Sequence, residues 1–131
     1  MYNGGEREGF SMLTNFDELK SLASSEMNKS FPAEEKKCGV TLTAKSGKIY
    51  KGHRVAFSDG QILDPVDMAL YAALADGETK FLAAAICGNE PPSKAALRRL
   101  ASFSDMMVSL NIGAVSADTS LRKLLLQLGE K

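Results

Sequence analysis

The stretch ILDPVDMALYAALADG, residues 62–77, decides the fold because it predicts a helix with a marked start, a buried face and a marked end. Asp64 can cap the free N–H groups of the first turn, and Pro65 suits the first helical position, where no N–H is needed. Ala-Asp-Gly at 75–77 favours termination. Its apolar residues recur at the spacing of one helical face: Val66, Ala69, Leu70, Ala73 and Leu74. We therefore expect a capped helix packed against a large core.

Strands are predicted on both sides of this helix. Residues 38–44 alternate between apolar and polar or small side chains, and Ser46-Gly47 is typical of a hairpin turn. We expect residues 48–57 to return as a second, antiparallel strand. Residues 80–88, KFLAAAICG, are apolar at both odd and even positions, which is typical of an interior strand covered on both faces.

The remaining segments complete an alternating pattern. A helix capped by Thr14 or Asn15 precedes the first strand, a helix capped by Ser93 follows the interior strand, and residues 105–112 fit a further strand. Residues 116–128 are predicted to form a last helix. Strands alternating with helices imply parallel pairs added to the hairpin, so the fold class is α/β with a mixed sheet. Residues 1–13 are expected to be a flexible tail, and residues 14–131 a single domain.

Composition narrows the function classes. The 131 residues contain 16 Lys plus Arg and 16 Asp plus Glu, so no net field draws nucleic acid or an acidic membrane. The basic side chains on the last two predicted helices lack interleaved aromatic residues for base stacking. No apolar run is long enough to span a bilayer, and the N-terminus lacks a signal-peptide layout. We expect a cytoplasmic protein with no nucleic-acid or membrane partner.

Four pieces of the chain, in this order, resemble the small homo-oligomeric cytidine deaminases: CGVTL at 38–42, SGKIYKG at 46–52, MALYAALADG at 68–77, and Pro91-Pro92 before the next helix. The resemblance spans roughly residues 15–128. It implies a three-layer α-β-α sandwich of the cytidine deaminase type, with a mixed sheet of about five strands. It also implies a homodimer or homotetramer.

The chemistry of that family does not carry over with the scaffold. The family holds Zn²⁺ by Cys or His at the start of the central helix and by two Cys at the start of the next, with a Glu as proton shuttle. The resemblance places the first ligand on Asp64, the shuttle on Val66, and the later cysteines on Ser93 and Ala96. Val66 cannot move a proton, and Ala96 cannot bind a metal. We therefore predict no metal, no other cofactor and no catalytic residue.

Three residues are candidates for ligand binding: Arg54, Asp64 and Ser93. Arg54 falls where the resemblance places a ribose contact, near two helix N-termini, and a guanidinium in such a place can hold a phosphate or carboxylate. Asp64 can be the remnant of a metal site, a plain helix cap or the ion-pair partner of Arg54, and the helix-start pattern favours the cap. His53 can be a ligand or base, but its strand position favours a half-buried sheet residue. Cys38 and Cys87 are interpreted as packing thiols.

The leading hypothesis is a catalytically inactive cytidine deaminase-like protein, a pseudoenzyme that acts as an oligomeric binding or structural module. Nucleosides, nucleotides and small anions are the ligand classes considered. Oligomerisation is also favoured by alanines of the central helix, at 69, 72, 73 and 75, which permit close approach of a second subunit. The alternative is an active nucleoside or nucleotide deaminase with a reorganised site, or a hydrolase that uses Asp64, Arg54 and Asp67.

Overall fold

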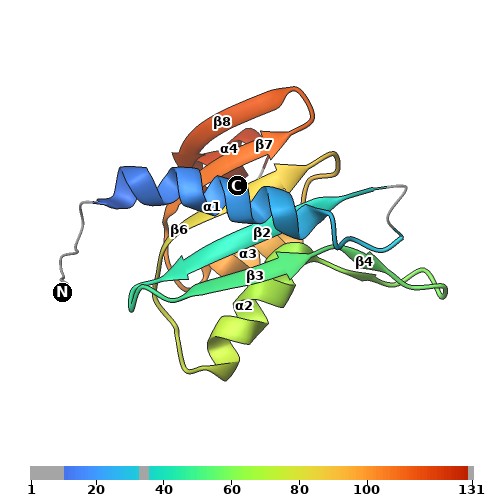
Figure 1. Cartoon of the computed structure of the whole chain (residues 1–131), viewed down its shortest axis with the longest axis horizontal. Helices are drawn as coiled ribbons and strands as arrows, with labels where there is room; N and C mark the ends of the chain where they lie inside the picture. Colours follow the sequence, from blue (N-terminus) through green and yellow to red (C-terminus); the bar gives the residue numbers. More distant parts are fainter. Residues whose placement is uncertain (1–10, 33–35, 130–131) are drawn as a thin grey trace.

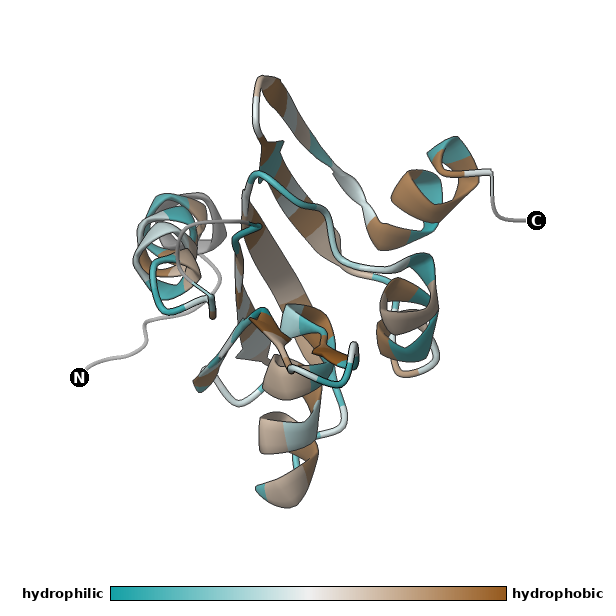
Figure 2. Cartoon of the chain, turned by 90° about the vertical axis from the view of Figure 1, so that its right-hand side faces the viewer, coloured by the Kyte–Doolittle hydropathy of each residue, from teal (hydrophilic) through white to brown (hydrophobic). Residues whose placement is uncertain are grey.

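A five-stranded mixed sheet forms the centre of the computed structural model, which describes residues 11–32 and 36–129 (Figure 1). The strands lie in the order β3 (Ile49–His53), β2 (Cys38–Ala44), β6 (Phe81–Gly88), β7 (Met107–Ile112) and β8 (Val115–Ser120). The helices are α1 (Ser11–Met27), α2 (Pro65–Ala75), α3 (Lys94–Ala101) and α4 (Leu121–Gln127). Figure 2 shows α1 on one side of the sheet and the other three helices on the opposite side. The predicted α/β fold with a mixed sheet of about five strands is confirmed.

The central helix and the interior strand agree with their sequence patterns. Helix α2 has Asp64 as N-cap and Pro65 in its first turn, and it ends at Ala75. Strand β6 lies between β2, to which it is antiparallel, and β7, to which it is parallel. Strand β6 is covered on both faces. Its small side chains let α1 pack closely on one face, and α2 and α3 cover the other.

The C-terminal part of the chain differs from the prediction. Residues 115–120, of which 116–120 were expected to be helical, instead form the edge strand β8, which pairs antiparallel with β7. Gly113, with φ of 58°, makes the turn that reverses the chain there. Helix α4 begins only after Ser120, whose hydroxyl accepts the N–H of Lys123. The leucine spacing predicted a long helix, but it holds only for α4, which has seven residues.

Two further boundaries differ from the prediction. Helix α1 begins at Ser11, so Thr14 and Asn15 lie inside the helix, and residues 11–13 are not part of a tail. The rest of the expected tail, residues 1–10, lies outside the described residues. The strand expected over 48–57 is divided: β3 ends at His53, and β4 (Val55–Ala56) pairs with β5 (Ile62–Leu63) in a separate two-stranded sheet.

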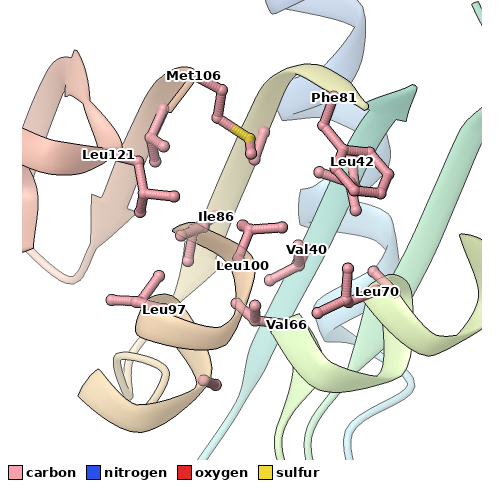
Figure 3. Close-up of a cluster of buried hydrophobic side chains, with 14 of the residues drawn as sticks. Val40, Leu42, Val66, Leu70, Phe81, Ile86, Leu97, Leu100, Met106 and Leu121 are labelled. Atoms are coloured by element: carbon pink, nitrogen blue, oxygen red, sulfur yellow. The ribbon is translucent and has the colours of Figure 1, made fainter. Parts of the chain in front are cut away.

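Two hydrophobic clusters hold the layers together. The larger one lies between the sheet and α2, α3 and α4, where Val66, Leu97 and Leu100 meet Val40 and Ile86 (Figure 3). The smaller one lies under α1, where Leu19 and Ala23 pack on the alanines of β6. A Cβ atom on Gly39 would come within 2.3 Å of the backbone of α1, so this contact requires glycine. The cores thus fix α2 and α3 side by side at one end of the sheet.

Candidate functional site

The N-termini of α2 and α3 meet in a region that we call the helix junction, made of Asp64, Asp67, Ser93 and Arg99. The Asp64 carboxylate joins the two helices: Oδ1 accepts the N–H of Val66 at 2.9 Å, and Oδ2 accepts the N–H of Ser93 at 2.8 Å. The Ser93 hydroxyl in turn accepts the N–H of Ala96. The side chains of Asp64 and Ser93 therefore satisfy backbone donors that the first turns of the two helices leave free.

A second contact closes the junction one turn further along. Arg99 of α3 donates two hydrogen bonds to the Asp67 carboxylate of α2, at 2.9 Å and 2.7 Å. The paired geometry of a guanidinium and a carboxylate makes this a strong and directional contact. Asp67 is thus engaged within the protein, which removes it from the set of free acids that a hydrolase mechanism would need.

The residues at this junction do not fit a zinc ion. Among the described residues, no group of three or more His, Cys, Asp or Glu side chains is placed to hold a metal. Val66, at the position that the resemblance gives to the proton shuttle, is 1% exposed and belongs to the larger core. Ala96 is equally buried in that core. Neither side chain can coordinate a metal or transfer a proton.

Burial shifts two titratable groups next to the junction. Burial raises the pKa of Asp64, while the N–H groups of Ser93 and Val66 act in the opposite direction. Burial also raises the pKa of the Cys38 thiol to about 12, with smaller contributions from the charges of Asp64, Cys87 and Glu90, while Arg54 lowers it. At this pKa the thiol stays protonated near neutral pH and is a poor nucleophile. Both cysteines are free and buried, as the packing interpretation expects.

Arg54 lies in the segment between β3 and β4, and it forms no ion pair with Asp64. Its backbone N–H donates to the carbonyl of Cys38, and its own carbonyl accepts the N–H of Phe31. The residue is only 8% exposed. The structure therefore brings Asp64 and Ser93 into contact, but it leaves Arg54 without the Asp64 ion pair that the sequence left open. Among the described residues, no hydrogen bond or ion pair reaches the guanidinium.

His53 points to the other face of the sheet. Its Nδ1 lies 2.8 Å from the Glu26 carboxylate of α1, and Lys29 approaches the other oxygen of Glu26 at 3.2 Å. Burial raises the pKa of Glu26, but the hydrogen bonds with His53 and Lys29 outweigh it and leave the pKa lowered. His53 is therefore a half-buried sheet residue that ties α1 to β3, in agreement with the sequence interpretation.

The chain has similar solved structures but no similar sequences among the protein families and curated proteins. No protein-family profile matches the sequence, and no curated protein is significantly similar to it. The cytidine deaminase from Burkholderia pseudomallei superposes with a TM-score of 0.70 at 22% identity, over 82% of this chain and 94% of that chain. This chain has the cytidine deaminase fold. The deaminase from Mycobacterium leprae matches with a TM-score of 0.71 at 18% identity, over 85% of this chain and 97% of that chain. The deaminase from Mycobacterium tuberculosis matches with a TM-score of 0.70 at 14% identity, over 84% and 93% of the respective chains.

Sequence reasoning missed the two features that close the junction. The bond from Ser93 to Asp64 joins residues 29 positions apart, and the Asp67–Arg99 pair joins residues 32 positions apart. Arg99 is one of the basic side chains of α3, and about half of its side chain is exposed. The sequence signal for the Asp67–Arg99 pair was an acidic residue on one helix and a basic residue on another, with the two helices starting next to each other. Within residues 11–32 and 36–129, no helix is long and apolar enough to cross a membrane.

Proposed function

We propose that this chain is a cytidine deaminase-like protein that does not deaminate, and that it acts as an oligomeric module that binds a small anionic ligand, nucleotides included. The observation that carries the proposal is the Asp64 carboxylate, both oxygens of which hold backbone N–H groups of the two helix starts. The resemblance puts the first zinc ligand at this residue. A carboxylate used in this way stabilises the scaffold at the place where the related enzymes would hold their metal.

The neighbouring positions support the same proposal. The Ser93 hydroxyl caps α3 through Ala96, and Val66 and Ala96 pack in the core. The positions that carry ligands and the shuttle in the resembling family thus serve capping and packing here. Deamination needs an activated water and a proton carrier, and the junction offers neither.

The proposed self-association is supported by exposed apolar side chains near the β4–β5 hairpin. Phe31, Phe57 and Ile62 are each more than half exposed. The alanines of α2 contribute less than the sequence suggested, because Ala69 and Ala73 are buried against the sheet and only Ala72 and Ala75 face outward. Light scattering coupled to size exclusion tests this part directly, and a monomer at all concentrations would contradict it.

Metal analysis of the purified, untagged protein, run beside a cytidine deamination assay with added zinc, tests the loss of activity. We expect no stoichiometric zinc and no ammonia release. Zinc in equimolar amount, lost together with turnover in Asp64→Ala, would contradict the proposal and favour the reorganised enzyme. Arg122→Gln, which changes an exposed residue far along the sequence, is the matched control for handling and purity.

A further inference from the structure

We propose that a second copy of this chain docks on one face of the β4–β5 hairpin, with the two hairpins antiparallel across a two-fold axis near Val55. The surface that makes this contact, which we call the hairpin strip, consists of Phe31, Lys51, His53, Val55, Phe57 and Asp59. The inference rests on the self-association in the proposed function, and it names the surface and the orientation of the partner.

The backbone places a row of side chains from β3 and β4 on the α1 side of the sheet. His53 lies on that side, because its Nδ1 is 2.8 Å from the Glu26 carboxylate of α1. Side chains two residues apart in extended backbone share a side. Lys51 therefore lies on the α1 side as well. The backbone hydrogen bonds of residue 54 continue the strand pairing from β3 into β4, so Val55 and Phe57 extend the same row along the hairpin.

Two aromatic side chains make the middle of the hairpin strip apolar. Phe31 forms a parallel bridge with Val55, so it lies beside Val55 on the same side. Phe31 is 63% exposed and Phe57 is 52% exposed. The hairpin that carries Phe57 extends away from the five-stranded sheet (Figure 1). Large apolar side chains that gather on one surface, rather than singly, are typical of an interaction site.

Opposite charges lie at the two ends of the hairpin strip. Lys51 is exposed at the base. Lys29 lies near the same end, because it approaches at 3.2 Å the Glu26 carboxylate that also contacts His53. Glu26 balances one of the two lysines, so these groups leave a positive charge at the base. Asp59 is exposed in the turn between β4 and β5, which places a negative charge at the tip.

The spacing of these charges makes the hairpin strip complementary to itself. Lys51 and Asp59 are each four positions from Val55. A two-fold axis makes the same patch on both copies meet itself, so each contact forms twice. With the axis near Val55 and the strips antiparallel, Lys51 lies opposite the partner's Asp59, and the apolar middles cover each other. An unrelated partner would need the same pattern by chance, so a second copy is the occupant that the observations favour.

The test exchanges the charges and measures the dimer of the full-length chain by sedimentation equilibrium. Asp59→Lys and Lys51→Glu each turn both ion pairs into like-charge contacts, so each variant alone should dimerise about tenfold more weakly than the wild type. An equimolar mixture of the two variants restores both pairs and should dimerise as tightly as the wild type. The double variant Lys51→Glu/Asp59→Lys should do the same. Single variants that dimerise normally, or a mixture that stays as weak as its components, overturn the proposal.

A matched pair of variants tests the apolar middle. Phe57→Ser should weaken the dimer about tenfold, as is typical of an aromatic residue at the centre of an interface. Leu126→Ser removes an equally exposed apolar side chain from α4, on the other side of the sheet, and should leave the dimer unchanged. Thermal unfolding followed by circular dichroism checks that each variant is folded. Equal weakening by both variants overturns the proposal.

The outcomes distinguish this inference from the proposed function. An oligomer whose affinity ignores the charge variants contradicts only the present inference. A monomer at all concentrations contradicts the proposed self-association as well. Zinc-dependent deamination by a protein that still responds to the charge exchange contradicts the proposed loss of activity and supports the interface.

Discussion

Asp64 and Arg54 lie at the same end of the sheet and carry opposite charges, yet their side chains differ in the contacts that they make. The Asp64 carboxylate accepts one N–H from each of two helices, and these hydrogen bonds stabilise the fold. Arg54 is more deeply buried than Asp64, with 8% of the residue exposed, and within the described part of the chain its guanidinium forms no ion pair. The difference indicates that Asp64 contributes to the stability of the helix junction through direct hydrogen bonds, whereas Arg54 makes no comparable side-chain contact among the described residues.

The largest effect is expected from removal of the Asp64 carboxylate. Asp64→Ala leaves the N–H groups of Val66 and Ser93 without acceptors, so we expect the free energy of unfolding to fall by about 2–3 kcal/mol, from one lost cap and one further unsatisfied donor. Urea denaturation followed by circular dichroism measures the change. Asp64→Asn keeps one carbonyl acceptor and should lose about half as much. Equal losses in the two variants would mean that charge, and not the two acceptor atoms, matters at the junction.

The opposite sign is expected at Arg54. Arg54→Met replaces the buried charge by an apolar side chain of similar length, and we expect the free energy of unfolding to rise by about 1 kcal/mol in chloride buffer. The same urea denaturation experiment provides the measurement. A loss of stability in Arg54→Met would show that the guanidinium is already satisfied and would erase the contrast with Asp64.

A smaller, asymmetric effect is expected at the second contact of the junction. Asp67 is mostly buried, with 11% of its side chain exposed, while 48% of the Arg99 side chain is exposed. Arg99→Gln leaves a buried carboxylate without its partner, whereas Asp67→Asn leaves an arginine that water can reach. We therefore expect Arg99→Gln to lower the denaturation midpoint more than Asp67→Asn does. The reverse order would mean that Asp67 finds another donor.

The smallest effect concerns the pH dependence of stability. The lowered pKa of Glu26 means that its contribution is present above its ordinary pKa and is lost as the pH falls through the lowered value. The raised pKa of Asp64 acts with the opposite sign, so that its contribution is greatest in acid and decreases as the pH rises through the raised value. In stability profiles measured from about pH 3 to pH 8, Glu26→Gln should lose stability mainly at the neutral end. Asp64→Asn should reduce the decrease of stability with rising pH that the raised pKa of Asp64 causes. Stability profiles with unchanged slopes in both variants would contradict the pKa directions assigned to Glu26 and Asp64.

Local patterns predicted most of the fold because they describe contacts close in sequence. The cap of α2 at Asp64 and the cap of α3 at Ser93 needed only helix-start rules, and both are confirmed. Residues 116–120 were misassigned because the leucines that follow carry a strong helical pattern, while the turn signal at Gly113 is a single residue. The candidate site was less predictable. Whether Asp64 would pair with Arg54 or with backbone donors depends on how α3 packs against α2, which no local pattern specifies.

Strand β8 has a consequence for the behaviour of the protein at high concentration. It is the last strand of the sheet, so one side of its backbone has no neighbouring strand within the described part of the chain. Exposed strand edges of this kind promote edge-to-edge joining and aggregation, and proteins oppose this with charged residues on the edge. Asp118 is the one ionisable residue within β8, and it is exposed. Asp118 therefore supplies the charge that opposes edge-to-edge pairing along β8, at the sheet edge opposite to β3.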